Sequence, residues 1–226
     1  MRVAIHQPEF LPWFGYIHKL SNVGKFVLLD DVQFRKNYFQ NRNRIITKQG
    51  LVWLTVPIKN TVLSKKIRET YINKEQNYRK KIVTTIEQNY KKYHFFKDLK
   101  ELLEILSQDY ETIFELNFEV IKLLIEKLDI KTDIILQSDL NTKRHKNELL
   151  LEICQKVGAK QYMMSFSGGG MEYFDFNLFK RNGIDVVEHK FEVIKYDQKY
   201  VDEFFKYVSF VDIVANMGWK GLKNGI

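Results

Sequence analysis

The chain has 226 residues, 45% of them hydrophobic, so it can bury a sizeable core as one domain or two small ones. Lysine and arginine total 36 against 28 acidic residues; the net charge of +8 favours acidic partners, although solvated lysine-rich helices would also explain it. No apolar run approaches the ~20 residues of a membrane span, the N-terminus lacks the pattern of a secretory signal, and a single cysteine excludes an internal disulfide framework. We therefore expect a cytoplasmic protein with no membrane span.

The N-terminal segment has the pattern of a strand, a stiff loop, a helix and a second strand. Residues 2–6 and 26–30 are the two short buried strands. Pro8 and Pro12 cannot lie inside a regular sheet or a helix interior, so they stiffen the loop that leads into a helix ended by Gly24. This order is typical of a parallel βαβ unit.

Polar side chains follow both strands, and the carboxyl ends of adjacent parallel strands face one crevice. This predicts that His6 and Gln7 lie near Asp30, Asp31 and Gln33. His6 is a candidate site residue, and one of the two aspartates is a candidate ligand contact, because adjacent side chains point to opposite faces. A structural histidine and turn aspartates are the competing interpretations. We predict no metal site, since no HExxH motif or spaced histidine and cysteine cluster accompanies these residues.

A hairpin is expected next, over residues 44–58, with its turn at 47–50 and its place at the edge of the sheet. Asn41, Arg42 and Arg44 supply amide and guanidinium donors that suit a phosphate or a carboxylate. The competing interpretation is a polar shoulder of the hairpin. No basic and aromatic array for nucleic acid stands out from the lysine background.

The middle of the chain is helical in pattern, because apolar residues recur at helical spacing from about 77 to 128. Strands and helices then alternate again, and the fold class is α/β, a mostly parallel sheet with flanking helices in Rossmann-like order. Residues 1–76 and 131–226 would form the α/β core, and 77–130 a helical insertion or layer. The later elements are strands at 133–138, 161–165 and 184–191 and helices at 143–157, 171–181 and 209–218, the last with a capping box of Ser209 and Asp212.

A glycine-rich loop lies between the expected strand 161–165 and the next helix. Its glycines, including Gly168 and Gly169, would let the backbone approach an anion at a helix N-terminus, although the loop matches neither a Walker A motif nor GxGxxG. Tyr162, Ser165 and Ser167 flank it and could hydrogen-bond a substrate. A glycine loop without a ligand is the competing interpretation.

Several of these stretches together resemble the WbqC-like protein family. HQPEFLPWFGYIHKL is similar to the family pattern H-Q-P-x-Y-x-P-W-x-G-Y-x-x-K, with Phe10 where tyrosine is expected. The resemblance extends through DDVQFRKNYFQNRNRI, LTVPI, YMMSFSGGGMEYFD and the closing YVSFVDIVANMG, and Phe166 in the glycine loop is a second departure. It covers nearly the whole chain, less securely the helical middle.

The resemblance implies a role in bacterial surface-polysaccharide biosynthesis, of the O-antigen or lipopolysaccharide type. It implies a transferase that attaches an acyl or aminoacyl group to a nucleotide-linked amino sugar. The donor would be an acyl thioester on CoA or a carrier protein, or an aminoacyl-tRNA, and the cofactor is left open. A nucleotidyltransferase-like enzyme and a non-catalytic binding protein for sugar nucleotides are the alternatives.

The same resemblance distributes roles among the candidate residues. His6 would be the general base toward the sugar amine, with Asp30 or Asp31 orienting it or holding sugar hydroxyls. Arg42 and Arg44 would hold phosphates, and the glycine loop the pyrophosphate or the donor. The candidate substrate-binding residues are Gln7, Trp13, Tyr16, Gln33, Asn41, Arg42, Arg44, Tyr162, Ser165, Ser167, Gly168 and Gly169.

Overall fold

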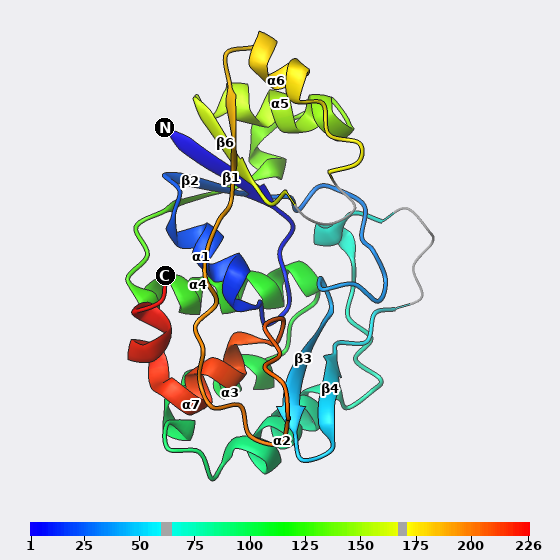
Figure 1. Cartoon of the computed structure of the whole chain (residues 1–226). Helices are drawn as coiled ribbons and strands as arrows, with labels where there is room; N and C mark the ends of the chain where they lie inside the picture. Colours follow the sequence, from blue (N-terminus) through cyan, green and yellow to red (C-terminus); the bar gives the residue numbers. More distant parts are fainter. Residues whose placement is uncertain (60–64, 167–170) are drawn as a thin grey trace.

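The computed structural model describes residues 1–59, 65–166 and 171–226, and in them a five-stranded sheet and a two-stranded sheet (Figure 1). The larger sheet has the order β5-β2-β1-β6-β7, and every neighbouring pair in it is parallel. Its strands are β1 (Arg2–His6), β2 (Lys25–Leu28), β5 (Asp133–Leu136), β6 (Gln161–Met164) and β7 (Asp185–Glu188). This parallel sheet confirms the predicted α/β class. The chain starts at the middle strand of the sheet and builds outward in both directions.

The two faces of the sheet belong to different apolar clusters. Ala4, Phe26 and Leu28 point into the larger one, with side chains of α1, α4 and α7. Val3 and Val27, one residue out of step, point into the smaller one, which α5 and α6 cover. This alternation with a period of two is what a strand buried on both faces requires, and it explains why these strands read as continuous apolar runs.

Helices lie on both sides of the sheet, with α5 and α6 on one side and α1, α4 and α7 on the other (Figure 1). The α-helices are α1 (Phe14–Ser21), α2 (Tyr78–Tyr90), α3 (Lys100–Ser107), α4 (Ile113–Leu128), α5 (Lys146–Lys156), α6 (Phe176–Arg181) and α7 (Phe210–Lys223). Short 3-10 turns form η1 (Ile67–Glu69), η2 (Phe96–Leu99) and η3 (Gln137–Leu140). The division into an α/β core and a helical insertion or layer stays a prediction. None of the helices within the described ranges has the length and hydropathy to cross a membrane.

The hairpin is present but is not at the edge of the parallel sheet, where we expected it. Strands β3 (Arg42–Thr47) and β4 (Gly50–Thr55) pair with each other as a separate antiparallel sheet. Ile45 and Leu54 of the hairpin are buried in the larger apolar cluster. The hairpin therefore packs by its side chains, and its backbone does not extend the parallel sheet.

The capping box predicted at the last helix does not form. The Ser209 hydroxyl accepts from the N–H of Val211 at 3.3 Å, but the N–H of Ser209 donates to the carbonyl oxygen of Arg44, so Asp212 cannot accept from it. The Asp212 carboxylate instead accepts from the hydroxyls of Tyr90 and Tyr196, at 2.7 Å each. The SFVD stretch thus ties α7 to the hairpin and to α2.

Two helices differ from their expected bounds by five residues at one end. The helix expected over 171–181 starts at Phe176, because the Asp175 carboxylate accepts from the N–H of Leu178 at 3.0 Å and caps it there. The last helix continues past Gly218 to Lys223, with a kink at that glycine, whose φ is 69°. Glycine adopts this left-handed conformation without strain, so the chain bends and the helix resumes.

Candidate functional site

A cavity of about 880 Å³ lies beyond the carboxyl ends of β1 and β6. These two neighbours are where the strand order reverses, and open α/β sheets bind ligands at that point. Five of the candidate residues line the cavity: His6, Gln7, Trp13, Tyr162 and Ser165. The lining is largely apolar and aromatic, with a few polar groups from the end of β1 and its loop, from α1, from the end of β6, and from Lys146 and Asn147 of α5.

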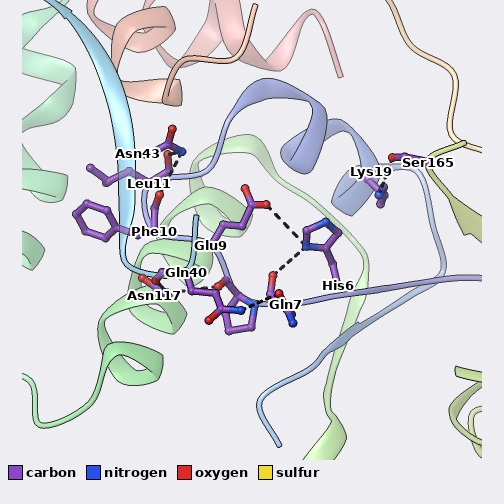
Figure 2. Close-up of polar contacts among 11 residues, drawn as sticks. His6, Gln7, Glu9, Phe10, Leu11, Lys19, Gln40, Asn43, Asn117 and Ser165 are labelled. Atoms are coloured by element: carbon purple, nitrogen blue, oxygen red, sulfur yellow. Dashed lines mark hydrogen bonds and ion pairs between the residues drawn. The ribbon is translucent and has the colours of Figure 1, made fainter. Parts of the chain in front are cut away.

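The loop after β1 is held by side-chain amides from distant parts of the chain (Figure 2). Asn43 of β3, which is fully buried, donates to the carbonyl oxygens of Phe10 and Leu11 at 3.3 and 2.8 Å. Asn117 of α4 donates to the carbonyl of Pro8 at 3.4 Å. Leu11 has a positive φ of 45°, which is strained for leucine. The two prolines therefore stiffen a loop whose conformation buried amides maintain.

His6 lies at the end of β1 and is held as a neutral imidazole. Its Nδ1 is 3.0 Å from the carbonyl oxygen of Gln7, an acceptor, so Nδ1 carries the proton and Nε2 is the ring atom left to accept one. The edge of the ring packs against the Tyr16 ring, with 5.0 Å between the centroids. Burial, with the Lys19 charge as the second cause, lowers the pKa of His6 to about 3. The exposed 31% of the side chain borders the cavity.

Glu9, which sequence reasoning missed, lies in the same loop and lines the same cavity. Only 6% of the residue is exposed, and its Oε2 has no hydrogen-bond partner among the described residues. Burial raises the pKa of its carboxyl to about 8, against the opposing influence of Lys19. Its Oε1 is 4.0 Å from Nδ1 of His6. At neutral pH Glu9 is therefore mainly a protonated carboxylic acid beside a neutral imidazole.

Lys19, also missed, is a buried amine on α1, and 6% of it is exposed. Its Nζ donates to the Ser165 hydroxyl at 3.1 Å and lines the cavity (Figure 2). Burial lowers the pKa of the Lys19 amine to about 8, although Glu9 raises it. One signal could have identified Lys19: it is the lysine that closes the family pattern H-Q-P-x-Y-x-P-W-x-G-Y-x-x-K.

The two aspartates after β2 have their own partners and do not line the cavity. Asp30 is 1% exposed, and its carboxylate accepts from the backbone N–H of Ser138 at 2.9 Å. Asp31 forms ion pairs with Lys66 and Arg68, at 2.8 and 2.6 Å. The acceptor that orients His6 is therefore the Gln7 carbonyl. Gln33 forms a backbone bridge to residue 66 rather than lining the cavity.

The polar row before and within β3 divides into one structural amide and two arginines. Asn41 is 3% exposed and donates to the carbonyl of Val56 at 2.9 Å, so it joins the two hairpin strands. Arg42 and Arg44 lie on β3 with their guanidinium carbons 4.2 and 5.2 Å from the centroid of the Trp53 ring. They are outside the lining of the cavity.

Of the remaining candidates, Trp13 and Tyr162 line the cavity, Tyr16 does not, and three lie outside the described residues. The Trp13 ring folds over α1 above Gly15, where a Cβ would collide with it. Tyr16 is 2% exposed, and its hydroxyl has no hydrogen-bond partner among the described residues. Tyr162 stacks on Phe179 with 5.5 Å between the centroids. Ser167, Gly168 and Gly169 lie outside the described residues, and the part of the chain that is described contains no group of three or more metal-ligating side chains.

The structure is that of an α/β protein of Rossmann-like order with a cavity where the strand order reverses. The chain belongs to the WbqC-like protein family, whose model matches residues 7–224. It is also similar to the uncharacterized protein Rv1507c of Mycobacterium tuberculosis (strain ATCC 25618 / H37Rv), with 30% identity over 220 residues, 96% of this chain and 94% of that protein. No solved structure matches it. The family indicated by the motifs is thus confirmed.

Proposed function

We propose that this protein transfers an acyl or aminoacyl group from an activated donor to the amine of a nucleotide-linked sugar. The reaction would belong to the biosynthesis of a bacterial surface polysaccharide of the O-antigen type, as membership of the WbqC-like family suggests. The observation that supports it is a pair of ionisable groups with opposite pKa shifts, His6 and Glu9, in one cavity. Groups whose environments separate their pKa values in this way are suited to act as base and acid.

The proposed roles follow from which group holds a proton. The sugar amine, entering as the free base, attacks the carbonyl carbon of the donor, and its N–H becomes acidic as the C–N bond forms. Nε2 of His6 accepts that proton, while Glu9 donates its own to the leaving thiolate or alkoxide as the C–S or C–O bond breaks. Transfer of a proton from His6 to Glu9 restores the starting state.

Lys19 would contribute its positive charge to this reaction. Its ammonium form, beside Ser165, would stabilise the negative charge that develops on the carbonyl oxygen. Burial is the main cause of the low pKa of His6 and the Lys19 charge the second, so an anionic substrate beside Lys19 would reverse part of the shift.

The test is a transfer assay with purified protein, UDP- and dTDP-linked amino sugars, and either acetyl-CoA or aminoacyl-tRNA as donor. Mass spectrometry detects the acylated sugar nucleotide. We expect His6→Ala to lower kcat by about 10²–10⁴-fold, while calorimetry shows wild-type affinity for the sugar nucleotide. The matched control is His94→Ala, since His94 is exposed on another part of the fold. Wild-type turnover by His6→Ala would refute the proposal, and binding without product from any donor would favour a binding protein.

A nucleotidyltransferase is the second candidate. It is favoured by the position of the cavity, which lies beside the loop between β1 and α1 at the strand-order reversal, where that loop would meet a nucleotide. This enzyme would need a nucleoside triphosphate and magnesium, and it would release pyrophosphate. Pyrophosphate release that depends on His6, with no acyl transfer, would select this candidate.

A further inference from the structure

Arginine and aromatic side chains form a continuous surface between the β3–β4 hairpin and the mouth of the cavity. We call it the arginine–aromatic rim, and it consists of Arg35, Tyr38, Phe39, Arg42, Arg44, Trp53 and Tyr207. Neighbouring members are in contact: Arg35 lies over Tyr38 at 4.6 Å, Tyr38 is 5.4 Å from Phe39, and Phe39 is 6.1 Å from Trp53. Tyr38, Phe39 and Tyr207 also line the cavity, so the rim is its outer border.

The two arginines of β3 retain unused hydrogen-bonding capacity. Both guanidinium groups lie over the Trp53 ring, and the Nε of each is buried with no hydrogen-bond partner among the described residues. Nη2 of Arg44 donates a hydrogen bond to the carbonyl oxygen of Tyr207 at 3.4 Å. Neither forms an ion pair with any carboxylate that the structure places, whereas Arg68 pairs with Asp31. The Nε atoms are too buried to reach a ligand, so an anion would meet the Nη groups at the edge of each stacked guanidinium.

The aromatic members are exposed to an extent that packing alone does not require. Trp53 is 41% exposed, Tyr38 is 42% and Tyr207 is 46%. Single exposed aromatics are common, but three of them beside uncompensated arginines at a cavity mouth suggest a ligand surface. Every nucleobase has a flat face that stacks on such rings, and phosphates pair with guanidinium groups.

We propose that the arginine–aromatic rim binds the nucleoside diphosphate part of the substrate. The phosphates contact Arg42 and Arg44, and the base stacks on the exposed aromatic rings around Trp53. The sugar then extends past Tyr207 and Trp13, whose ring centroids are 4.9 Å apart, toward His6 in the cavity. This inference rests on the proposed function for the identity of the sugar, but the nucleotide site stands on the rim alone.

The experiment measures binding of UDP and dTDP, without sugar or donor, by isothermal calorimetry. We expect Trp53→Ala to weaken binding by about 5- to 150-fold, the range for loss of one stacking contact. Trp53→Phe should keep most of the affinity, because a ring remains. Replacement of both Arg42 and Arg44 by alanine should weaken binding and reduce its dependence on salt.

Tyr71→Ala is the matched control. Tyr71 is 43% exposed and also lies under a cation, Lys65 at 5.4 Å, but it does not line the cavity. Its replacement should leave nucleotide affinity unchanged, and unchanged melting temperatures would show that all variants fold. Wild-type affinity in both Trp53→Ala and the double arginine variant would overturn the proposal.

Two further outcomes separate this inference from the proposed function. Nucleotide binding that needs the rim, with no acyl transfer in any assay, supports the rim and refutes the transferase. Acyl transfer that is insensitive to Trp53→Ala refutes the rim and leaves the transferase intact. A single-stranded RNA oligonucleotide ending in CCA is the last arm: if it binds through Trp53 while UDP and dTDP do not bind, the rim is an RNA site and our proposal is wrong.

Discussion

The ends of β1 and β2 carry ionisable side chains in opposite situations, although the two strands are neighbours in one sheet. After β2, the carboxylates of Asp30 and Asp31 have partners: a backbone N–H for the first, and Lys66 and Arg68 for the second. After β1, Glu9 is buried with an unpartnered oxygen, and His6 faces a cavity. Carboxylates that pair with cations or with backbone donors stabilise the fold, whereas buried groups that have neither are where perturbed pKa values and ligand chemistry occur.

The largest effect that we expect to separate the two strand ends is the contribution of Glu9 to the pH dependence of folding stability. The pKa of its carboxyl is 4.5 when unperturbed and about 8 in the folded protein, so between these values the folded state holds a proton that the unfolded state has lost. The wild-type protein therefore loses stability as pH rises through this window, by about 1.4 kcal/mol per unit from this group. Glu9→Gln does not titrate, so its stability relative to wild type should increase from pH 5 to pH 8.

Urea unfolding of both proteins at several pH values measures that difference. Most other titrating groups are shared by the two proteins and cancel, and Lys19→Met in both backgrounds shows how much of the effect passes through Lys19, the charge that opposes the shift. A difference that stays constant across the window would mean that Glu9 is already ionised in the folded protein, and the acid role proposed for it would be wrong.

The second prediction concerns the amides that hold the loop after β1. Asn43→Ala removes the donor to the buried carbonyls of Phe10 and Leu11, and leaving buried acceptors unsatisfied costs about 1–3 kcal/mol. Denaturant unfolding measures the loss. Gln88→Ala, which removes an exposed amide from α2, should change stability little. Equal stability of the two variants would show that Asn43 does not hold the loop.

The smallest expected effect is at the end of β2. Asp31→Asn breaks ion pairs with Lys66 and Arg68, whose side chains are 41% and 42% exposed, and such surface pairs contribute about 0.2–1 kcal/mol. Stability should fall by this amount at low salt and by less at high salt, because salt screens exposed charges. Turnover in the transfer assay should stay at the wild-type level. A loss of turnover comparable to that of His6→Ala would place Asp31 in the active site and remove the contrast between the two strand ends.

Much of the fold followed from local patterns. The buried strands, a loop that carries Pro8 and Pro12, and the parallel order were predicted from apolar runs and proline chemistry, and the structure confirms them. The rule for strand ends placed His6 and Gln7 at a crevice, and both line the cavity. The rule was wrong for Asp30, Asp31 and Gln33, which it put beside them and which do not line the cavity. These features depend on residues close in sequence or on a general rule of sheet topology, so one sequence is enough to infer them.

Other features depend on contacts between distant segments, which no local pattern encodes. The apolar side chains of the hairpin enter the larger cluster. Asp212 accepts from two tyrosines, and the N–H of Ser209 donates to the carbonyl of Arg44. The arginine–aromatic rim, which the lysine background hid in the sequence, forms only where the hairpin meets residue 207.

The sequence by itself determined the α/β class, the family and the position of His6 at a strand end. Only the tertiary structure decided which ionisable groups lose their water. Lys19 meets Ser165 across 146 residues of chain, and Glu9 is buried by the folding of the loop that carries it. Burial, rather than residue type, separates the pKa values of His6 and Glu9, because removing water from a charge is a property of the assembled fold.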